Sequence, residues 1–459
     1  MNALNAVLPW ADHPKRAREF ASHRVPRTAR VRALAHIFNN HDNPTMTDTP
    51  HTPANRGWIV TFAGLGINLA LGILYAWSLV KGVIEKEFGW KGTQPNDPYA
   101  VCCLVFAGAM ILAGRCQDKF GPRITATIGG VLVGIGFYVA SLSTNYWNWI
   151  IGFGVLAGTG IGFGYSSATP PALKWFPPAK TGLIAGLVVA GFGLAPVYLA
   201  PLTDYLLKTG TPSEGVLHAM RVYSVLLTVI VIGLAQFLVN PPAGFSAAKS
   251  SSATPAAGAT PGEIVRQPRF WLLWLIYLIG SGAGLMVISS VSKMARNSMG
   301  SLAFVAVAVL AVGNAGGRVL AGTLSDKIGR RWTLCLVLIV QAALMFAAIP
   351  ITGSKDKLPV LVVTLAALIG ANYGANLSLF PSLTKELWGL KSFGMNYGML
   401  FTAWGVGGFV LPKVQQILFN ASKDAAGEGN YASSFMLAGG LLIAGTALTF
   451  LIKPQSKAA

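Results

Sequence analysis

Arg318 is the residue of this chain with the clearest capacity for binding chemistry. It lies in the apolar run A-V-L-A-V-G-N-A-G-G-R-V-L-A-G-T-L, which carries no other charge. A charge within a membrane-spanning run costs about 3 kcal/mol or more, so such a residue usually faces a cavity and has a task there. Guanidinium stays charged, and its planar fork fits a carboxylate with two hydrogen bonds. Arg318 is therefore predicted to bind an anion.

The alternative for Arg318 is a structural charge that extends to the membrane surface. The nearest polar loop begins around Asp326, eight residues further along the chain. At a rise of about 1.5 Å per residue, Arg318 lies about 12 Å inside that loop. This is a long reach for one side chain, which favours the binding role.

Aromatic and amide side chains within other apolar runs are candidates for the walls of the same site. Aromatic rings supply apolar walls, and a tyrosine hydroxyl can donate to a carboxylate. Asn314 lies one helical turn before Arg318, on the same face. Core packing or contacts between helices are the alternative for each of them. The predicted substrate-binding set is Tyr75, Trp77, Tyr165, Asn314, Arg318, Tyr373 and Trp404.

A short polar segment occurs twice in the chain. G-R-C-Q-D-K-F-G-P-R at 114–123 reappears as G-T-L-S-D-K-I-G-R-R at 322–331, and each copy follows an apolar run. The glycines permit close helix approach and sharp turns, and the aspartates can cap a helix or pair with a base in one conformation only. Both copies are predicted to be gating loops. Their residues are Gly114, Asp118, Lys119, Gly121, Arg123, Gly322, Asp326, Lys327, Gly329, Arg330 and Arg331.

Composition indicates an all-α integral membrane protein. Hydrophobic residues make up 53% of the 459 residues and charged residues 11%, whereas soluble domains carry about 25% charged residues. The apolar runs are about 20 residues long, which is typical of membrane-spanning helices. The doubled loop predicts a duplicated half and hence two six-helix bundles. The twelve predicted spans are 57–80, 98–116, 124–142, 147–170, 182–204, 219–239, 269–291, 301–324, 332–351, 358–381, 394–419 and 431–452.

The basic residues predict the topology. With both termini and the even-to-odd loops in the cytoplasm, most of the 35 lysines and arginines lie on the cytoplasmic side, as the positive-inside rule requires. This explains the net charge of +19 without a nucleic-acid partner. The predicted location is the cell membrane, most simply a bacterial inner membrane. The predicted parts are a basic tail (1–55), an N-terminal bundle (56–239), a cytoplasmic linker (240–267), a C-terminal bundle (268–452) and a tail (453–459).

Three readings of the basic tail stay open. It can be a disordered segment near anionic lipid, it has features of a transit peptide, or translation can start at Met46, directly before the first span. In the linker, Gly262–Val265 is expected to begin a short surface helix. The four cysteines have no metal-ligand spacing, so no metal or cofactor is expected. No nucleotide-binding loop or catalytic constellation indicates an enzyme.

The doubled loop resembles the signature loop of the major facilitator superfamily, and the resemblance covers the chain from about 57 to 452. Pro122 interrupts the first basic pair, and lysine stands at 119 and 327 where arginine is common. Further fragments are similar to the oxalate/formate antiporter branch, near the monocarboxylate transporters. These are L-Y-A-W at 74–77, F-G-Y-S-S-A-T-P-P-A-L-K-W-F-P at 163–177, K-T-G-L-I-A-G-L-V-V-A-G-F-G at 180–193, N-A-G-G-R at 314–318, L-F-P-S at 379–382 and N-Y-G at 396–398.

The resemblance implies alternating access, with Arg318 binding the substrate carboxylate. The family's oxalate carrier has a second cation, a lysine, where Trp404 stands here, so one carboxylate is favoured over a dianion. Asn314 replaces the aspartate of proton-linked relatives and cannot titrate. The expected substrate is a small monocarboxylate such as formate, lactate or pyruvate, and the carrier is expected to be monomeric. Oxalate:formate antiport and a non-transporting substrate sensor are the alternatives, while the lack of a clear intramembrane acid argues against export of cationic drugs.

Overall fold

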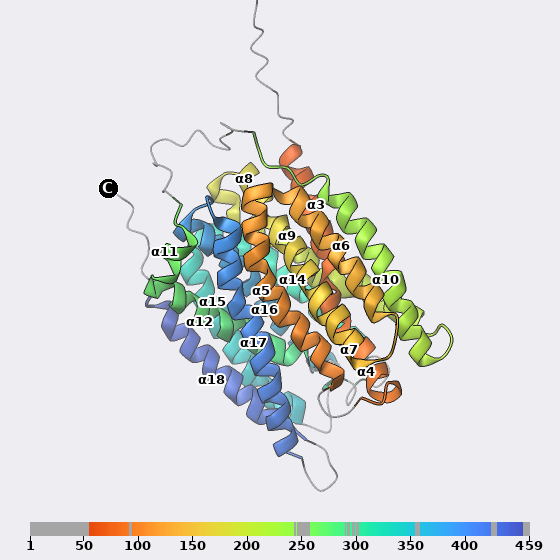
Figure 1. Cartoon of the computed structure of the whole chain (residues 1–459). Helices are drawn as coiled ribbons and strands as arrows, with labels where there is room; N and C mark the ends of the chain where they lie inside the picture. The colour runs from red at the N-terminus through yellow and green to blue at the C-terminus, as the bar shows by residue number, and fades with distance from the viewer. Residues whose placement is uncertain are drawn as a thin grey trace, which may run out of the picture. The chain divides into compact units, whose positions relative to one another are not determined.

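The computed structural model describes residues 55–90, 94–242, 245, 258–289, 291, 294–295, 299, 303–353, 359–423 and 429–452. The predicted tails 1–55 and 453–459 lie outside this part except for Asn55, as does half of the predicted linker, 243–244 and 246–257. In the part that is described, long helices run side by side (Figure 1). The model is all-helical over these residues, as predicted from the composition.

The first six predicted spans are helical, with two local departures from the regular α-helix. The first span changes to a 3₁₀ turn, η1, before it continues, and the fourth passes through a π-helical segment, η3. The elements are α3 (Arg56–Leu71), η1 (Gly72–Ala76), α4 (Trp77–Glu87), η2 (Gln94–Asn96), α5 (Asp97–Phe120), α6 (Pro122–Ala140), α7 (Tyr146–Trp149), η3 (Ile150–Ala157), α8 (Gly158–Trp175), η4 (Pro178–Lys180), α9 (Thr181–Leu207) and α10 (Pro212–Ala235).

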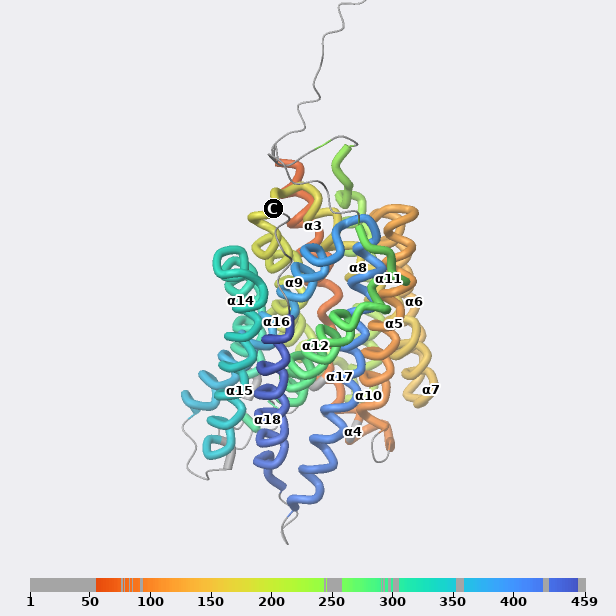
Figure 2. The backbone as a smooth tube through the Cα atoms, turned by 90° about the vertical axis from the view of Figure 1, so that its left-hand side faces the viewer, coloured from red at the N-terminus to blue at the C-terminus, as the bar shows by residue number. Residues whose placement is uncertain are grey.

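The other six predicted spans are helical as well, and the short surface helix expected at 262–265 is present as α11. There the Thr260 backbone N–H donates to Glu263 Oε2 at 2.7 Å, which lowers the pKa of that carboxyl. The elements are α11 (Pro261–Val265), α12 (Pro268–Ile288), α14 (Ala303–Ile328), α15 (Arg330–Gly353), α16 (Pro359–Trp388), α17 (Phe393–Ala421) and α18 (Ala432–Thr449). Figure 2 shows α14, α15 and α18 in one view.

Eleven helices of the described part are long and apolar enough to cross a membrane. The predicted span 394–419, now α17, is the one that this count leaves out. It is a 29-residue helix, about 43 Å long at 1.5 Å per residue and thus sufficient to cross a bilayer. Its apolar run is interrupted by Asn396 near its start and by Lys413, Gln415 and Gln416 further along; the Asn396 side chain is buried in the protein.

The two halves meet chiefly at two helix pairs, α5 with α17 and α9 with α14, and α9 also contacts α16. Glycines lie at both crossings: a Cβ on Gly114 would fall 2.3 Å from the Gly394 backbone, and one on Gly182 would fall 2.1 Å from the Gly322 carbonyl oxygen. Small residues of this kind let helices approach to backbone contact. The first glycine of each repeated loop therefore takes part in a close crossing between the halves.

Candidate functional site

Close packing of α14 against α9 and α16 at glycine residues fixes the position of Arg318. A Cβ on Gly186 of α9 would lie 2.5 Å from the Arg318 carbonyl oxygen, and one on Gly317 would lie 1.9 Å from the Ala371 oxygen of α16. Helix α14 is therefore in backbone contact with α9 on one side and α16 on the other. This packing leaves Arg318 with no exposed surface, and its side chain lies between the halves.

The hydrogen-bond partners of the Arg318 guanidinium in the described part of the chain are all neutral groups. Its Nε donates to Asn314 Oδ1 at 2.9 Å, and one terminal nitrogen donates to the carbonyl oxygen of Val189 in the other half. The other terminal nitrogen reaches the Tyr75 hydroxyl at 3.4 Å, which is a weak contact. Among the residues that the structure describes, no carboxylate forms an ion pair with Arg318. A buried cation without a counter-charge favours binding of an anion.

Hydrogen bonds extend from Arg318 to two further predicted residues. The hydroxyls of Tyr75 and Tyr373 are 2.7 Å apart, and Trp404 Nε1 donates to the Tyr373 hydroxyl at 2.9 Å. Tyr75 comes from the N-terminal half and the other two residues from the C-terminal half. The structure thus brings together Tyr75, Asn314, Arg318, Tyr373 and Trp404, which we call the Arg318 network.

Two predicted residues lie outside this network. Trp77 packs against Phe153 and Trp149 within the N-terminal half, with ring centroids 4.6 and 6.1 Å away, and its Nε1 has no partner. Trp77 follows Tyr75 by two residues, and in a helix such neighbours point in different directions. Tyr165 approaches the network through aromatic rings, since its ring contacts those of Phe106 and Phe192 at 5.4 Å.

A small cavity adjoins the Arg318 network. Its wall includes Tyr75 and Asn314 together with apolar side chains of α9, α12 and α14, such as Pro196, Ile288 and Leu310. Leu310 and Asn314 precede Arg318 in α14, so the cavity lies on the side of Arg318 away from the repeated loops. We call the side that carries the loops the motif side; it is the side predicted to be cytoplasmic.

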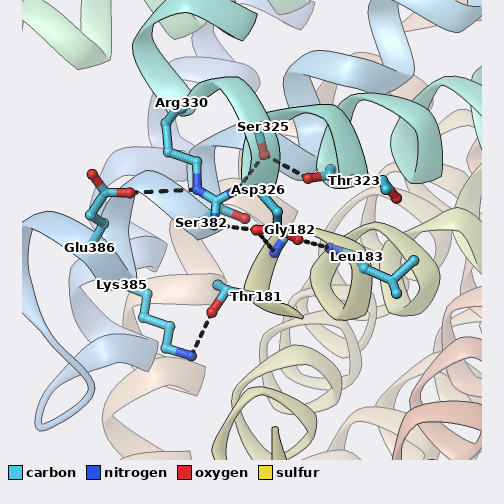
Figure 3. A network of polar contacts seen from close by, with 12 residues as sticks. Thr181, Gly182, Leu183, Thr323, Ser325, Asp326, Arg330, Ser382, Lys385 and Glu386 are labelled. Carbon is cyan, nitrogen blue, oxygen red and sulfur yellow. Dashed lines mark hydrogen bonds and ion pairs between the residues drawn. The ribbon is translucent and has the colours of Figure 1, made fainter. Parts of the chain in front are cut away.

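The second repeated loop forms a buried polar cluster between the halves (Figure 3). The Asp326 carboxylate accepts hydrogen bonds from the backbone N–H groups of Gly182 (2.9 Å) and Leu183 (3.0 Å) at the start of α9. The positive end of the α9 dipole also stabilises this carboxylate. Arg330 pairs with Asp326 at 2.5 Å, and both side chains are less than 10% exposed. We call these four residues the Asp326 cluster.

Helix α16 adds two charged contacts to the same region. Lys385 Nζ donates to Thr181 Oγ1 in the other half at 2.8 Å, and Glu386 lies 3.5 Å from Arg330 Nε (Figure 3). Sequence reasoning did not single out either residue. Their signal was weak, because charges at a helix end on the predicted cytoplasmic side are expected for topology alone.

The first repeated loop makes the equivalent contact in a weaker form. Asp118 accepts from the Met395 backbone N–H at the start of α17, but at 3.4 Å and with an exposed side chain. Pro122 occupies the position that Arg330 holds in the second copy, so Asp118 has no such basic partner. Gly121 and Gly329, with φ values of 87° and 89°, make the same turn in both loops. The repeat therefore keeps its backbone geometry but differs in the strength of its aspartate contact.

The remaining loop residues do not join these contacts between the halves. Lys119 lies over the Phe120 ring at 5.1 Å, and Arg331 lies over the ring of Trp332 at 5.3 Å. Lys119 and Lys327 are exposed, and so is Arg123. Exposed charges beside aromatic rings are typical of a membrane surface. Their part in gating stays a prediction.

The sequence matches the model of the Major Facilitator Superfamily over residues 57–412 and 297–458, and the chain belongs to this superfamily. It is a multi-pass membrane transporter and not an enzyme. Among its relatives is the oxalate:formate antiporter of Oxalobacter formigenes, which is 29% identical over 79% of this chain and 84% of the antiporter. Human monocarboxylate transporter 11 is 24% identical over 87% of this chain and 84% of its own.

Solved structures agree with this fold. The proton:xylose symporter XylE superposes with a TM-score of 0.65 at 12% identity, covering 87% of this chain and 96% of its own. An outward structure of FucP gives a TM-score of 0.61 at 15% identity, covering 87% and 100%. At these identities the likeness concerns the fold alone.

Proposed function

We propose that the chain carries small monocarboxylate anions, of the formate, lactate and pyruvate type, by alternating access. The observation that carries this proposal is the fully buried Arg318, whose described hydrogen-bond partners are all neutral. One permanent cation between the halves balances one carboxylate. The Tyr75 and Tyr373 hydroxyls can reorient toward a bound carboxylate, and Trp404 gives the site an apolar wall.

In this proposal, movement of the two halves exposes Arg318 to one side of the membrane at a time. The Asp326 cluster and the weaker Asp118 contact hold the motif side closed while the anion is exchanged on the other side. The motif side is proposed to face the cytoplasm, with both termini on that side. No carboxylate or histidine of the described part bonds to Arg318, which favours anion exchange or uniport over obligatory proton coupling.

Oxalate:formate exchange is the second candidate, favoured by the relative that carries this name. Charge balance argues against it, because Trp404 lies where a second cation would be needed. Oxalate would then keep one carboxylate without a counter-charge in a low-dielectric site.

Uptake into proteoliposomes tests the proposal. Labelled formate, lactate, pyruvate and oxalate are supplied to vesicles that are empty or preloaded with unlabelled acid. We expect monocarboxylate uptake by the native chain, a loss of about 100-fold in Arg318→Ala, and a large loss in Arg318→Lys because the lysine lacks the planar fork. Arg221→Ala, which removes an exposed arginine of α10, is the control. Unchanged uptake in Arg318→Ala would refute the assignment, and oxalate uptake above formate uptake would favour the second candidate.

A further inference from the structure

Three buried tyrosine hydroxyls near Arg318 lack a well-formed hydrogen bond to any residue that the structure describes. Tyr165 of α8, Tyr277 of α12 and Tyr397 of α17 are each no more than 3% exposed. Within the described part of the chain, none of the three hydroxyls has a hydrogen-bond partner of normal geometry. A buried hydroxyl without a partner is costly, and such groups are rare in folded proteins. A phenylalanine would pack the same ring without this cost. Three of them together need an explanation in terms of a ligand.

The three side chains converge on one point between the halves. All three rings contact Phe401, with centroid distances of 5.4 Å for Tyr165, 6.0 Å for Tyr277 and 5.7 Å for Tyr397. The Tyr397 hydroxyl lies beside those of the other two, although no bond of normal geometry links them. One residue comes from the N-terminal half and two from the C-terminal half. We call these residues the tyrosine triad.

Two members of the triad lie at the depth of Arg318, and the third, Tyr397, lies nearer the motif side. Nine or ten residues separate Tyr165, Tyr277 and Arg318 from the motif-side ends of their helices. All three residues therefore lie about 15 Å from those helix ends. Tyr397 is four residues from the start of α17, about 6 Å deep. Tyr165 reaches the Arg318 network through Phe192, whose ring contacts Tyr75 at 5.2 Å. Tyr277 reaches it through Phe401, whose ring stacks on Trp404 at 5.0 Å.

Helix α8 extends this unpartnered polar surface toward the motif side. Thr169 lies one turn after Tyr165 on the same face, and its hydroxyl is also buried without a partner. Pro170 and Pro171 follow within the helix and supply no backbone N–H, so the carbonyl groups one turn earlier lose their usual donors. This part of α8 therefore has more buried hydroxyl and carbonyl groups than the described protein groups can hydrogen-bond.

We propose that the tyrosine triad is an uncharged subsite for a second oxygen of the substrate, which rests on the proposed function of Arg318. The carboxylate binds Arg318, and a 2-hydroxy or 2-oxo oxygen of the same molecule bonds to the triad. A phenol hydroxyl can donate to a carbonyl oxygen and also accept from a hydroxyl, so both acid types fit. A neutral subsite suits a neutral oxygen better than a second carboxylate. Among the small monocarboxylates, the subsite therefore favours 2-hydroxy and 2-oxo acids over formate and unsubstituted acids.

Lactate and propionate test this subsite, because they differ only by the 2-hydroxyl group. Isothermal titration calorimetry on the purified full chain measures both affinities for the native protein, for each single Tyr→Phe variant and for the triple variant. One hydrogen bond changes an affinity by about 2- to 10-fold. We expect lactate to bind the native chain about tenfold more tightly than propionate, and each Tyr→Phe variant to weaken lactate binding alone. Tyr223→Phe, which removes a hydroxyl bonded to Thr203 elsewhere in the N-terminal half, is the control.

Arg318→Ala separates the failure of the subsite from the failure of the proposed function. If both acids bind equally and Arg318→Ala abolishes that binding, the subsite is wrong and the anion site stands. The same conclusion follows if the Tyr→Phe variants weaken lactate and propionate equally, or if the triad binds only water and the variants change neither acid. If Arg318→Ala changes the binding of neither acid, or neither binds, both proposals fail. Should the triple variant not fold, the single variants give the same comparison.

Discussion

The two repeated loops differ in the strength of their aspartate contacts, and this difference predicts unequal effects of the same substitution. Asp326 accepts two backbone N–H groups of the other half at 2.9 and 3.0 Å in a buried setting. Asparagine keeps one acceptor oxygen but loses the charge and one of the two bonds. A charge-assisted hydrogen bond contributes about 1.5–3 kcal/mol, so Asp326→Asn should destabilise closure on the motif side by about 2 kcal/mol. That free energy corresponds to a change of about 30-fold in the ratio of closed to open molecules.

Asp118→Asn is the matched comparison. Asp118 faces the backbone N–H groups of Gly394 and Met395, but the Met395 bond is long, 3.4 Å, and the side chain is exposed. Exposed charge interactions contribute less than about 1 kcal/mol. We expect a shift of less than about fivefold. The second repeated loop should therefore contribute more than the first to closure of the motif side.

Distance measurements by electron paramagnetic resonance can follow closure. The native cysteines are replaced, and spin labels are attached at Lys180 and Lys327, two exposed positions on opposite sides of the contact between α9 and α14. The parent protein should give one short distance, and Asp326→Asn a second, longer population. An unchanged distance distribution in Asp326→Asn, or an equal change in Asp118→Asn, would refute the reasoning. Melting curves of both variants serve as the control for unfolding.

Three further substitutions follow from the same structure. Asn314→Asp places a carboxylate about 2.9 Å from Arg318 Nε. The ionised carboxylate competes with the substrate for Arg318 and the protonated form does not, so uptake should rise as the pH falls. A flat pH profile of uptake would contradict this. Trp404→Lys supplies a second cation and should increase the ratio of oxalate uptake to formate uptake about tenfold. If this ratio is unchanged in proteoliposomes, charge balance does not decide selectivity. Gly317→Ala places a Cβ 1.9 Å from the Ala371 oxygen. It should destabilise the protein by about 1–3 kcal/mol, which would be measured as a lower melting temperature. At the neighbouring Gly316 a Cβ meets no described atom within 4 Å, so Gly316→Ala should have little effect.

The class of fold could be predicted from the sequence because a membrane imposes strong, local requirements. A span must be about 20 apolar residues long and must satisfy its own backbone, so runs of apolar residues predict helices with little ambiguity. Superfamily membership followed from a loop that occurs twice. Arg318 was also recognisable, because a charge in such a run is rare whatever lies around it.

Which side chains meet was decided by the tertiary structure. Trp77 and Tyr75 are near neighbours in sequence, yet only Tyr75 reaches Arg318. Both aspartates of the repeat were singled out, but their acceptor roles depend on the facing starts of α9 and α17, which are distant in sequence. Tyr277 and Tyr397 went unnoticed as candidates because a tyrosine in an apolar helix has no distinctive local pattern. Convergence of side chains on one point depends on how separate helices cross, and that depends on backbone contacts such as those of Gly182 and Gly186, which only the folded chain reveals.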